Sequence, residues 1–176
     1  MSVRCEHNWS PTPDESFCRD CGPNRILAAN ASKWDLRFLE MARLVATYSK
    51  DPSTKVGAVI TDGRVIVSQG YNGFPSKMKD RAEDYADREV KYSRVIHGEM
   101  NALIFSVRPV TGMTLYTTPI APCDRCCVVM LQAGITRFVF PKLPVRLEGR
   151  WLDSVNRTKR YIEECGATWT EIVEGL

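Results

Sequence analysis

The spacing of apolar and polar positions changes along the chain, and this change predicts the order of the secondary-structure elements. Apolar residues three and four positions apart predict helices over residues 33–48, 97–106, 123–133 and 151–165. Short runs rich in β-branched and aromatic residues predict strands over residues 56–61, 65–69, 113–118, 135–140 and 168–173. The predicted order is therefore one helix, a pair of strands, and then helices that alternate with strands.

This order predicts an α/β fold, in which a mixed five-stranded sheet carries helices on both faces. Asp62-Gly63 lies between the first two strands and indicates a tight hairpin turn. Residues 76–93 mix charges of both signs with few large apolar side chains, so we expect a solvated connection that is helical around residues 80–90. Such a long connection could also serve as a lid over a nucleotide.

Composition limits the size and the location of the protein. The chain has 176 residues, of which 44% are hydrophobic, which suits one domain with a small appendage. A net charge of +3 is too small to indicate a nucleic-acid partner. No apolar run approaches the roughly 18 residues of a membrane span, and the first ten residues lack the apolar centre of a signal peptide. We therefore expect a cytoplasmic protein without a membrane partner.

The N-terminal segment contains a complete set of ligands for a structural zinc ion. Cys5, His7, Cys18 and Cys21 make a Cys₃His set within a segment too short to have a core of its own. The alternative is a disordered tail with incidental cysteines. We expect residues 1–30 to form a zinc-binding module with its linker, and residues 31–176 to form the catalytic domain.

A second group of metal-binding residue types lies in the middle of the chain. His97-Gly98-Glu99, followed by Pro-Cys-Asp-Arg-Cys ending at Cys126, matches the H-x-E and P-C-x-x-C pattern of zinc-dependent nucleobase deaminases. His97, Cys123 and Cys126 would hold Zn²⁺ and leave its fourth position open for water. Glu99 would not bind the metal, but would carry a proton from the water to the ring and then to the leaving ammonia.

The neighbours of this motif leave two points to decide. Cys127 also lies near the helical face of Cys123, and we interpret it as a small buried hydrophobe. Pro122 is expected in the first turn of the helix that carries the two cysteines. A closed zinc site without catalysis is the alternative for the whole group, and Glu99 argues against it, because a structural site needs no adjacent acid.

From residue 33 to residue 173 the chain resembles the deoxycytidylate (dCMP) deaminases of the zinc-dependent cytidine-deaminase superfamily, which share a three-layer fold. The motifs that carry the resemblance are DPSTKVGA (51–58), GYNGFP (70–75), HGEMNA (97–102), PCDRC (122–126) and QAGI (132–135). The resemblance implies deamination of dCMP to dUMP, the precursor of dTMP. It also implies the zinc and proton-transfer roles given above, a contact between Asn72 and the deoxyribose, and a place near the substrate for Ser53.

The resemblance further implies regulation and assembly. Many members, which occur in eukaryotes, bacteria and phages, are homohexamers that dCTP with Mg²⁺ activates and dTTP inhibits. The loop that lies near the allosteric nucleotide in the family corresponds here to Gly70, Tyr71, Asn72 and Gly73.

The sequence departs from the family pattern at three places. Two other classes of function also remain as alternatives. Gly98 replaces the more common alanine, and the N-terminal cysteines lie outside the shared region. The segment after residue 140 lacks the usual tyrosine, and leaves Lys142 and Arg146 as uncommitted candidates for the substrate phosphate. The chain could also deaminate dCTP, cytidine or adenosine in tRNA, or be a catalytically silent zinc-binding module.

Overall fold

The structure is a computed structural model that describes residues 17–18, 22–23 and 31–173. Strands β1 (Phe17–Cys18) and β2 (Gly22–Pro23) form a small antiparallel pair. The predicted N-terminal zinc ligands Cys5, His7 and Cys21 lie outside the described residues, and for Cys18 only its place in β1 is described. The N-terminal zinc module and the domain boundary at residue 30 therefore stay predictions.

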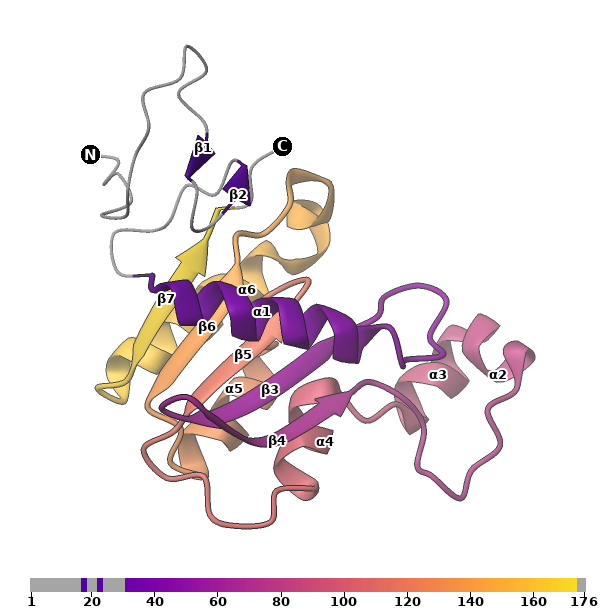
Figure 1. Ribbon diagram of the computed structural model, residues 1–176. Coiled ribbons are helices and arrows are strands. Elements are labelled where there is room, and N and C mark those ends of the chain that lie inside the picture. The colour runs from indigo at the N-terminus through magenta and orange to yellow at the C-terminus, as the bar shows by residue number, and fades with distance from the viewer. Residues whose placement is uncertain (1–16, 19–21, 24–30, 174–176) are drawn as a thin grey trace.

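One mixed five-stranded sheet forms the centre of the molecule, as predicted (Figure 1). Its order is β4-β3-β5-β6-β7, with antiparallel pairing from β4 to β5 and parallel pairing from β5 to β7. The strands are β3 (Gly57–Asp62), β4 (Val65–Tyr71), β5 (Thr114–Thr118), β6 (Arg137–Pro141) and β7 (Thr168–Ile172). The hairpin turns at Gly63, whose φ of 56° is easy for glycine and rare for other residues.

Helices cover both faces of the sheet, and the alternation of side chains along each strand explains why. Val59 of β3 points into a core beneath α1 (Lys33–Ala46), whereas Ala58 and Ile60 point into the core on the other face. That second core is covered by α4 (Gly98–Ile104), α5 (Asp124–Gln132) and α6 (Val145–Glu164). None of the helices between residues 31 and 173 combines the length and the apolar character that crossing a bilayer requires.

The helical structure expected around residues 80–90 is confirmed, with a break that the sequence did not predict. The segment expected to be helical around residues 80–90 contains two short helices, α2 (Ala82–Ala86) and α3 (Arg88–Arg94), which project from the end of the sheet (Figure 1). Asp87 separates them, because its carboxylate accepts hydrogen bonds from the backbone N–H groups of Glu89 and Val90 and so starts a new helix.

The last helix is longer than predicted. It starts at Val145, six residues before the expected start at Trp151, with Pro144 as its N-cap. From the sequence, Pro144 indicates only the end of the preceding strand. Proline is also favourable where a helix begins, and that is its role here. The extra turns are important because they include Arg150, which lines the pocket described below.

Candidate active site

The two metal-binding segments of the sequence meet at the N-termini of α4 and α5. His97 is the N-cap of α4, and Cys123 is the N-cap of α5. Pro122 therefore precedes the helix and does not lie in its first turn. The Cys123 sulfur accepts a hydrogen bond from the backbone N–H of Cys126 at 3.4 Å, as an N-cap side chain does.

Gly98 and Gly70 allow α4 to lie close against β4. A Cβ atom at Gly70 would lie 2.2 Å from the Ala102 nitrogen and 2.4 Å from the Gly98 carbonyl oxygen. A Cβ atom at Gly98 would lie 3.1 Å from the Val56 oxygen, so alanine at this position would need only a small shift. Gly70 therefore sets how closely α4, with its N-cap His97, approaches β4.

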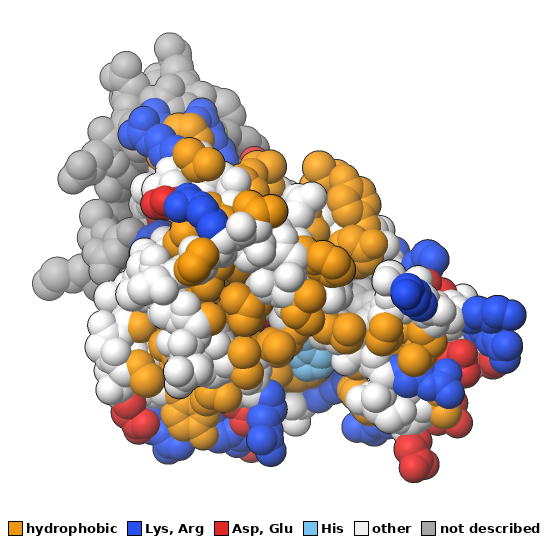
Figure 2. All heavy atoms as spheres, turned by 90° about the horizontal axis from the view of Figure 1, so that it is seen from below, with side chains coloured by type: hydrophobic (Ala, Val, Ile, Leu, Met, Phe, Trp, Pro, Cys, Tyr) orange, Lys and Arg blue, Asp and Glu red, His pale blue; other side chains and the backbone are white. Residues whose placement is uncertain are grey.

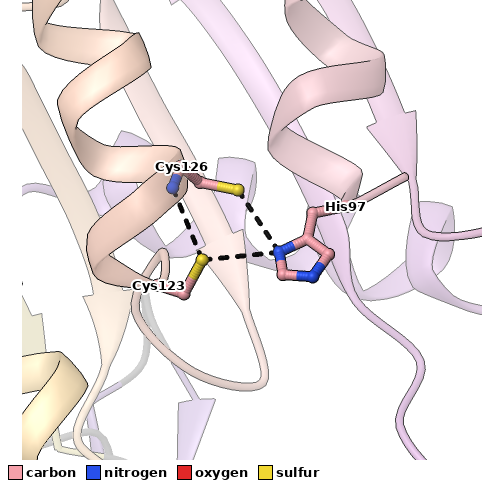
Figure 3. A group of neighbouring side chains, drawn as sticks. All are labelled: His97, Cys123 and Cys126. Atoms are coloured by element: carbon pink, nitrogen blue, oxygen red, sulfur yellow. Dashed lines mark hydrogen bonds between the residues drawn. The ribbon is translucent and has the colours of Figure 1, made fainter. Parts of the chain in front are cut away.

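His97, Cys123 and Cys126 bring their donor atoms together at one point (Figure 3). The imidazole Nδ1 lies 3.4 Å from the Cys123 sulfur and 3.3 Å from the Cys126 sulfur. In a tetrahedral zinc site, ordinary Zn–S and Zn–N bond lengths place sulfur and nitrogen about 3.5 Å apart. The spacing and the chemistry of these three donors therefore fit Zn²⁺.

The three side chains share protons, because the hydrogen bond with Cys123 and burial raise the pKa of the Cys126 thiol. Hydrogen bonding from Cys126 outweighs the effect of burial and, with the contact to His97, lowers the pKa of Cys123 to about 4. The hydrogen bond to Cys123 in turn raises the pKa of His97 to about 9. A divalent metal ion replaces the protons that such groups share.

Glu99 lies beside these donors without belonging to their cluster. It lies in the first turn of α4 and is only 3% exposed. Burial raises its pKa to about 7, against the opposing effect of His97. A carboxyl group in this position can both accept and release a proton near neutral pH.

A pocket connects these groups with the surface. His97, Glu99 and Cys123 line it together with apolar side chains of Val56, Ile120 and Ala121. Figure 2 shows a histidine side chain at the surface among apolar neighbours, and His97 is the only histidine in the described part of the chain. Cys127 is fully buried in the core, as predicted, and its thiol lies 3.8 Å from the Thr158 carbonyl oxygen.

Asn72 lines the pocket, but most of its amide is bound within the chain. Its Oδ1 accepts from the Val56 N–H at 2.7 Å, and its Nδ2 donates to the Thr54 carbonyl at 2.9 Å and to the Asp51 carboxylate at 3.2 Å. Both amide hydrogens are thus used, and one lone pair of Oδ1 remains. Asn72 therefore holds the loop after α1, a role that the sequence did not indicate.

Ser53 is exposed and does not line the pocket, although its neighbour Thr54 does. Its backbone N–H donates to Asp51 at 2.8 Å. Asp51 is buried and also accepts from the Lys91 ammonium at 2.8 Å. Sequence reasoning missed Asp51 and Lys91, which come together only in the folded chain.

Gly70, Tyr71, Asn72 and Gly73 line a second groove, next to the pocket. Asn72 borders both cavities. The side chains of Tyr48 and Phe74 also line this groove, and Phe74 stacks on Tyr85 at 4.3 Å between ring centroids. The structure thus places the predicted allosteric loop beside the pocket that contains the metal donors.

Comparisons with known proteins fit this geometry. The family model described as the cytidine and deoxycytidylate deaminase zinc-binding region matches residues 32–142. The chain belongs to this deaminase family. Membership confirms the resemblance and the enzyme class that the sequence predicted, a deaminase.

Relatives in the family match most of the chain. An uncharacterized deaminase of Aliivibrio fischeri is 39% identical over 140 residues, which cover 78% of this chain and 94% of that protein. A probable deoxycytidylate deaminase of Drosophila melanogaster is 36% identical over 150 residues, covering 74% and 73%. The dCMP deaminase of cyanophage S-TIM5, solved with dCMP and dUMP, superposes with a TM-score of 0.63 at 22% identity over 80% of this chain and 98% of that one. The last match confirms the predicted fold.

Proposed function

We propose that this protein is a dCMP deaminase that converts dCMP and water to dUMP and ammonia. The observation that carries the proposal is one pocket lined by a His97–Cys123–Cys126 donor cluster and by the buried carboxyl of Glu99. Relatives named deoxycytidylate deaminase support the choice of dCMP among cytosine compounds.

In this mechanism His97, Cys123 and Cys126 would hold the zinc ion. Zinc bound there supplies the Lewis acidity that makes water a nucleophile near neutral pH. Glu99 accepts a proton from the attacking water and passes it to the ring nitrogen of cytosine, as the water oxygen bonds to C4. It then takes the remaining proton of that oxygen and delivers it to the amine, which leaves as ammonia when the C4–N bond breaks. The apolar walls at Val56 and Ile120 exclude bulk water from the ring.

The predicted substrate contacts belong to the same proposal. The remaining lone pair on Asn72 Oδ1 can accept a hydrogen bond from a deoxyribose hydroxyl. Ser53 directly precedes Thr54, which lines the pocket, and this position supports its proposed place near the substrate.

The test is turnover of dCMP by the purified, zinc-loaded protein, followed as dUMP and ammonia. Glu99→Gln should lower kcat by at least about 10²-fold, since a positioned acid–base group contributes roughly 10²–10⁴-fold, and should keep the zinc. Glu83→Gln, an exposed carboxylate of α2, is the control with unchanged rate. Faster turnover of dCTP or cytidine would identify that compound, and not dCMP, as the substrate. Zinc binding without turnover of any of these compounds would support a catalytically silent zinc-binding module.

Regulation by nucleotides is a further part of the proposal. The groove bordered by Gly70 and Gly73 is the proposed site of dCTP with Mg²⁺ as activator and of dTTP as inhibitor, in a homohexamer. Its position supports this, because Asn72 borders both the groove and the pocket. Initial rates with each nucleotide, together with the mass in solution, test both parts.

A further inference from the structure

We propose that Arg150 binds the 5′-phosphate of the substrate and so makes this protein prefer nucleotides to nucleosides. This inference rests on the proposed function, because it takes the substrate to be a cytosine nucleotide. Arg150 lies on α6, in the part of the helix that the sequence did not predict, and it lines the same pocket as His97 and Glu99.

The charges around the pocket leave one cation without an anionic partner. Apart from the donor-cluster residue His97, two basic side chains line it, Lys91 and Arg150. Lys91 is buried and forms an ion pair with Asp51 at 2.8 Å, so its charge is already neutralised. Within residues 31–173, no ion pair includes Arg150.

The contacts of Arg150 fix its position and leave most of its donors available. One guanidinium nitrogen donates to the Tyr92 hydroxyl on α3, and the group lies 5.0 Å from the centre of the Trp151 ring. Tyr92 and Trp151 line the pocket as well. A guanidinium has five N–H donors in a planar fork, which suits two oxygens of one phosphate.

The shape of a nucleotide matches this arrangement. The amino group of the base and the 5′-phosphate lie at opposite ends of the molecule. When the base reaches the donor cluster at His97, the phosphate is left toward the solvent, where Arg150 is exposed. Lys142 and Arg146, the uncommitted candidates from the sequence, do not line the pocket.

The experiment measures binding of dUMP and of deoxyuridine by calorimetry, because neither compound is turned over by hydrolytic deamination. We expect Arg150→Gln to raise the Kd for dUMP by about 10- to 100-fold, because this is the usual contribution of a charge-assisted hydrogen bond to affinity. Deoxyuridine should bind this variant as it binds the original protein. Arg150→Lys should restore part of the loss, since lysine keeps the charge without the fork.

The matched control is Arg160→Gln. Arg160 also lies on α6 and also stacks on a neighbouring ring, Tyr161 at 5.3 Å, but it is outside the pocket. This variant should bind dUMP normally. An equal loss in Arg160→Gln would point to the overall charge of the helix and would overturn the assignment.

Two other results would overturn the proposal. They are equal binding of dUMP and deoxyuridine by the original protein, and equal weakening of both compounds by Arg150→Gln. Because binding is measured without turnover, the proposed function fails separately. A protein that binds dUMP through Arg150 but forms no dUMP from dCMP would keep this assignment and lose the proposed reaction.

Discussion

At the scale of single residues, Gly70 decides where the catalytic segment lies. Gly70→Ala would place a Cβ atom 2.2 Å from a backbone nitrogen of α4, a contact that no rotamer change can relieve. We expect a loss of about 3 kcal/mol in the free energy of unfolding and a lower kcat, since α4 carries Glu99. Urea unfolding and dCMP turnover measure the two effects.

The control for this prediction is the same substitution where space is free. Gly149 on α6 has no heavy atom within 4 Å of the position of a Cβ atom. Gly149→Ala should keep the rate and raise the free energy of unfolding by about 0.5–1 kcal/mol, because alanine favours a helix. Equal stability of Gly70→Ala and the original protein would contradict the close approach of β4 and α4.

The same scale shows what the sequence could reveal about the site. The positions of His97, Cys123 and Cys126 could be predicted, because the histidine and the cysteine pair each lie within a short motif. Lys91 and Arg150 could not be predicted in the same way. They come from segments 59 residues apart (150 − 91), and only the packed chain brings both to one pocket.

At the scale of elements, a buried polar network joins α1 to the sheet. Asp35 belongs to a capping box with Ser32 at the start of α1. Its carboxylate also accepts hydrogen bonds from Arg137 of β6 at 2.6 Å and from the Tyr116 hydroxyl of β5 at 2.8 Å. Burial raises the pKa of the Asp35 carboxyl group. The hydrogen bonds to the charged carboxylate outweigh this effect of burial, so that the pKa is lowered from its usual value of 3.8.

This network predicts a dependence of stability on pH. Asp35→Asn should cost about 3 kcal/mol at neutral pH, as a broken buried ion pair does. Because the folded-state pKa is lowered, the stabilisation is fully present above about pH 4 and is lost as the pH falls below it. The difference in unfolding free energy between the two proteins should therefore shrink from about pH 4 toward pH 2.

An exposed pair provides the comparison for this experiment. Asp62 and Arg108 form an ion pair at 2.8 Å, with side chains 57% and 48% exposed. Asp62→Asn should change the stability by less than about 1 kcal/mol. A pH-independent difference between Asp35→Asn and the original protein would contradict the role of the Asp35 charge.

The elements also show where prediction from the sequence fails. The pattern located the five strands of the central sheet to within two residues, because each is a short run rich in β-branched and aromatic residues. It did not separate α2 from α3, because that break depends on one capping carboxylate, Asp87. It also missed the first turns of α6, where Gly149 and Arg150 are exposed and show no apolar stripe.

At the scale of the whole molecule, metal content separates the two predicted zinc sites. The full chain should bind two zinc ions. Cys123→Ser should remove one of them and abolish dCMP turnover, since Cys123 belongs to the donor cluster of the pocket. Cys21→Ser should also remove one zinc ion but retain turnover. Metal analysis beside activity measures both, and one zinc ion in the full chain would contradict the N-terminal site.

Two of the three donor residues, Cys123 and Cys126, are close together in the sequence, and the third, His97, is far from both. Cys123 and Cys126 share one helical turn, whereas His97 lies 26 residues before Cys123 and reaches it only when the packed sheet brings α4 beside α5. At this site an unfolded chain therefore keeps only the two thiolates close together, whereas the folded chain presents three ligands at one point. Release of zinc to a coloured chelator should follow the unfolding of the sheet, so that the metal reports on folding as well as supplying the chemistry.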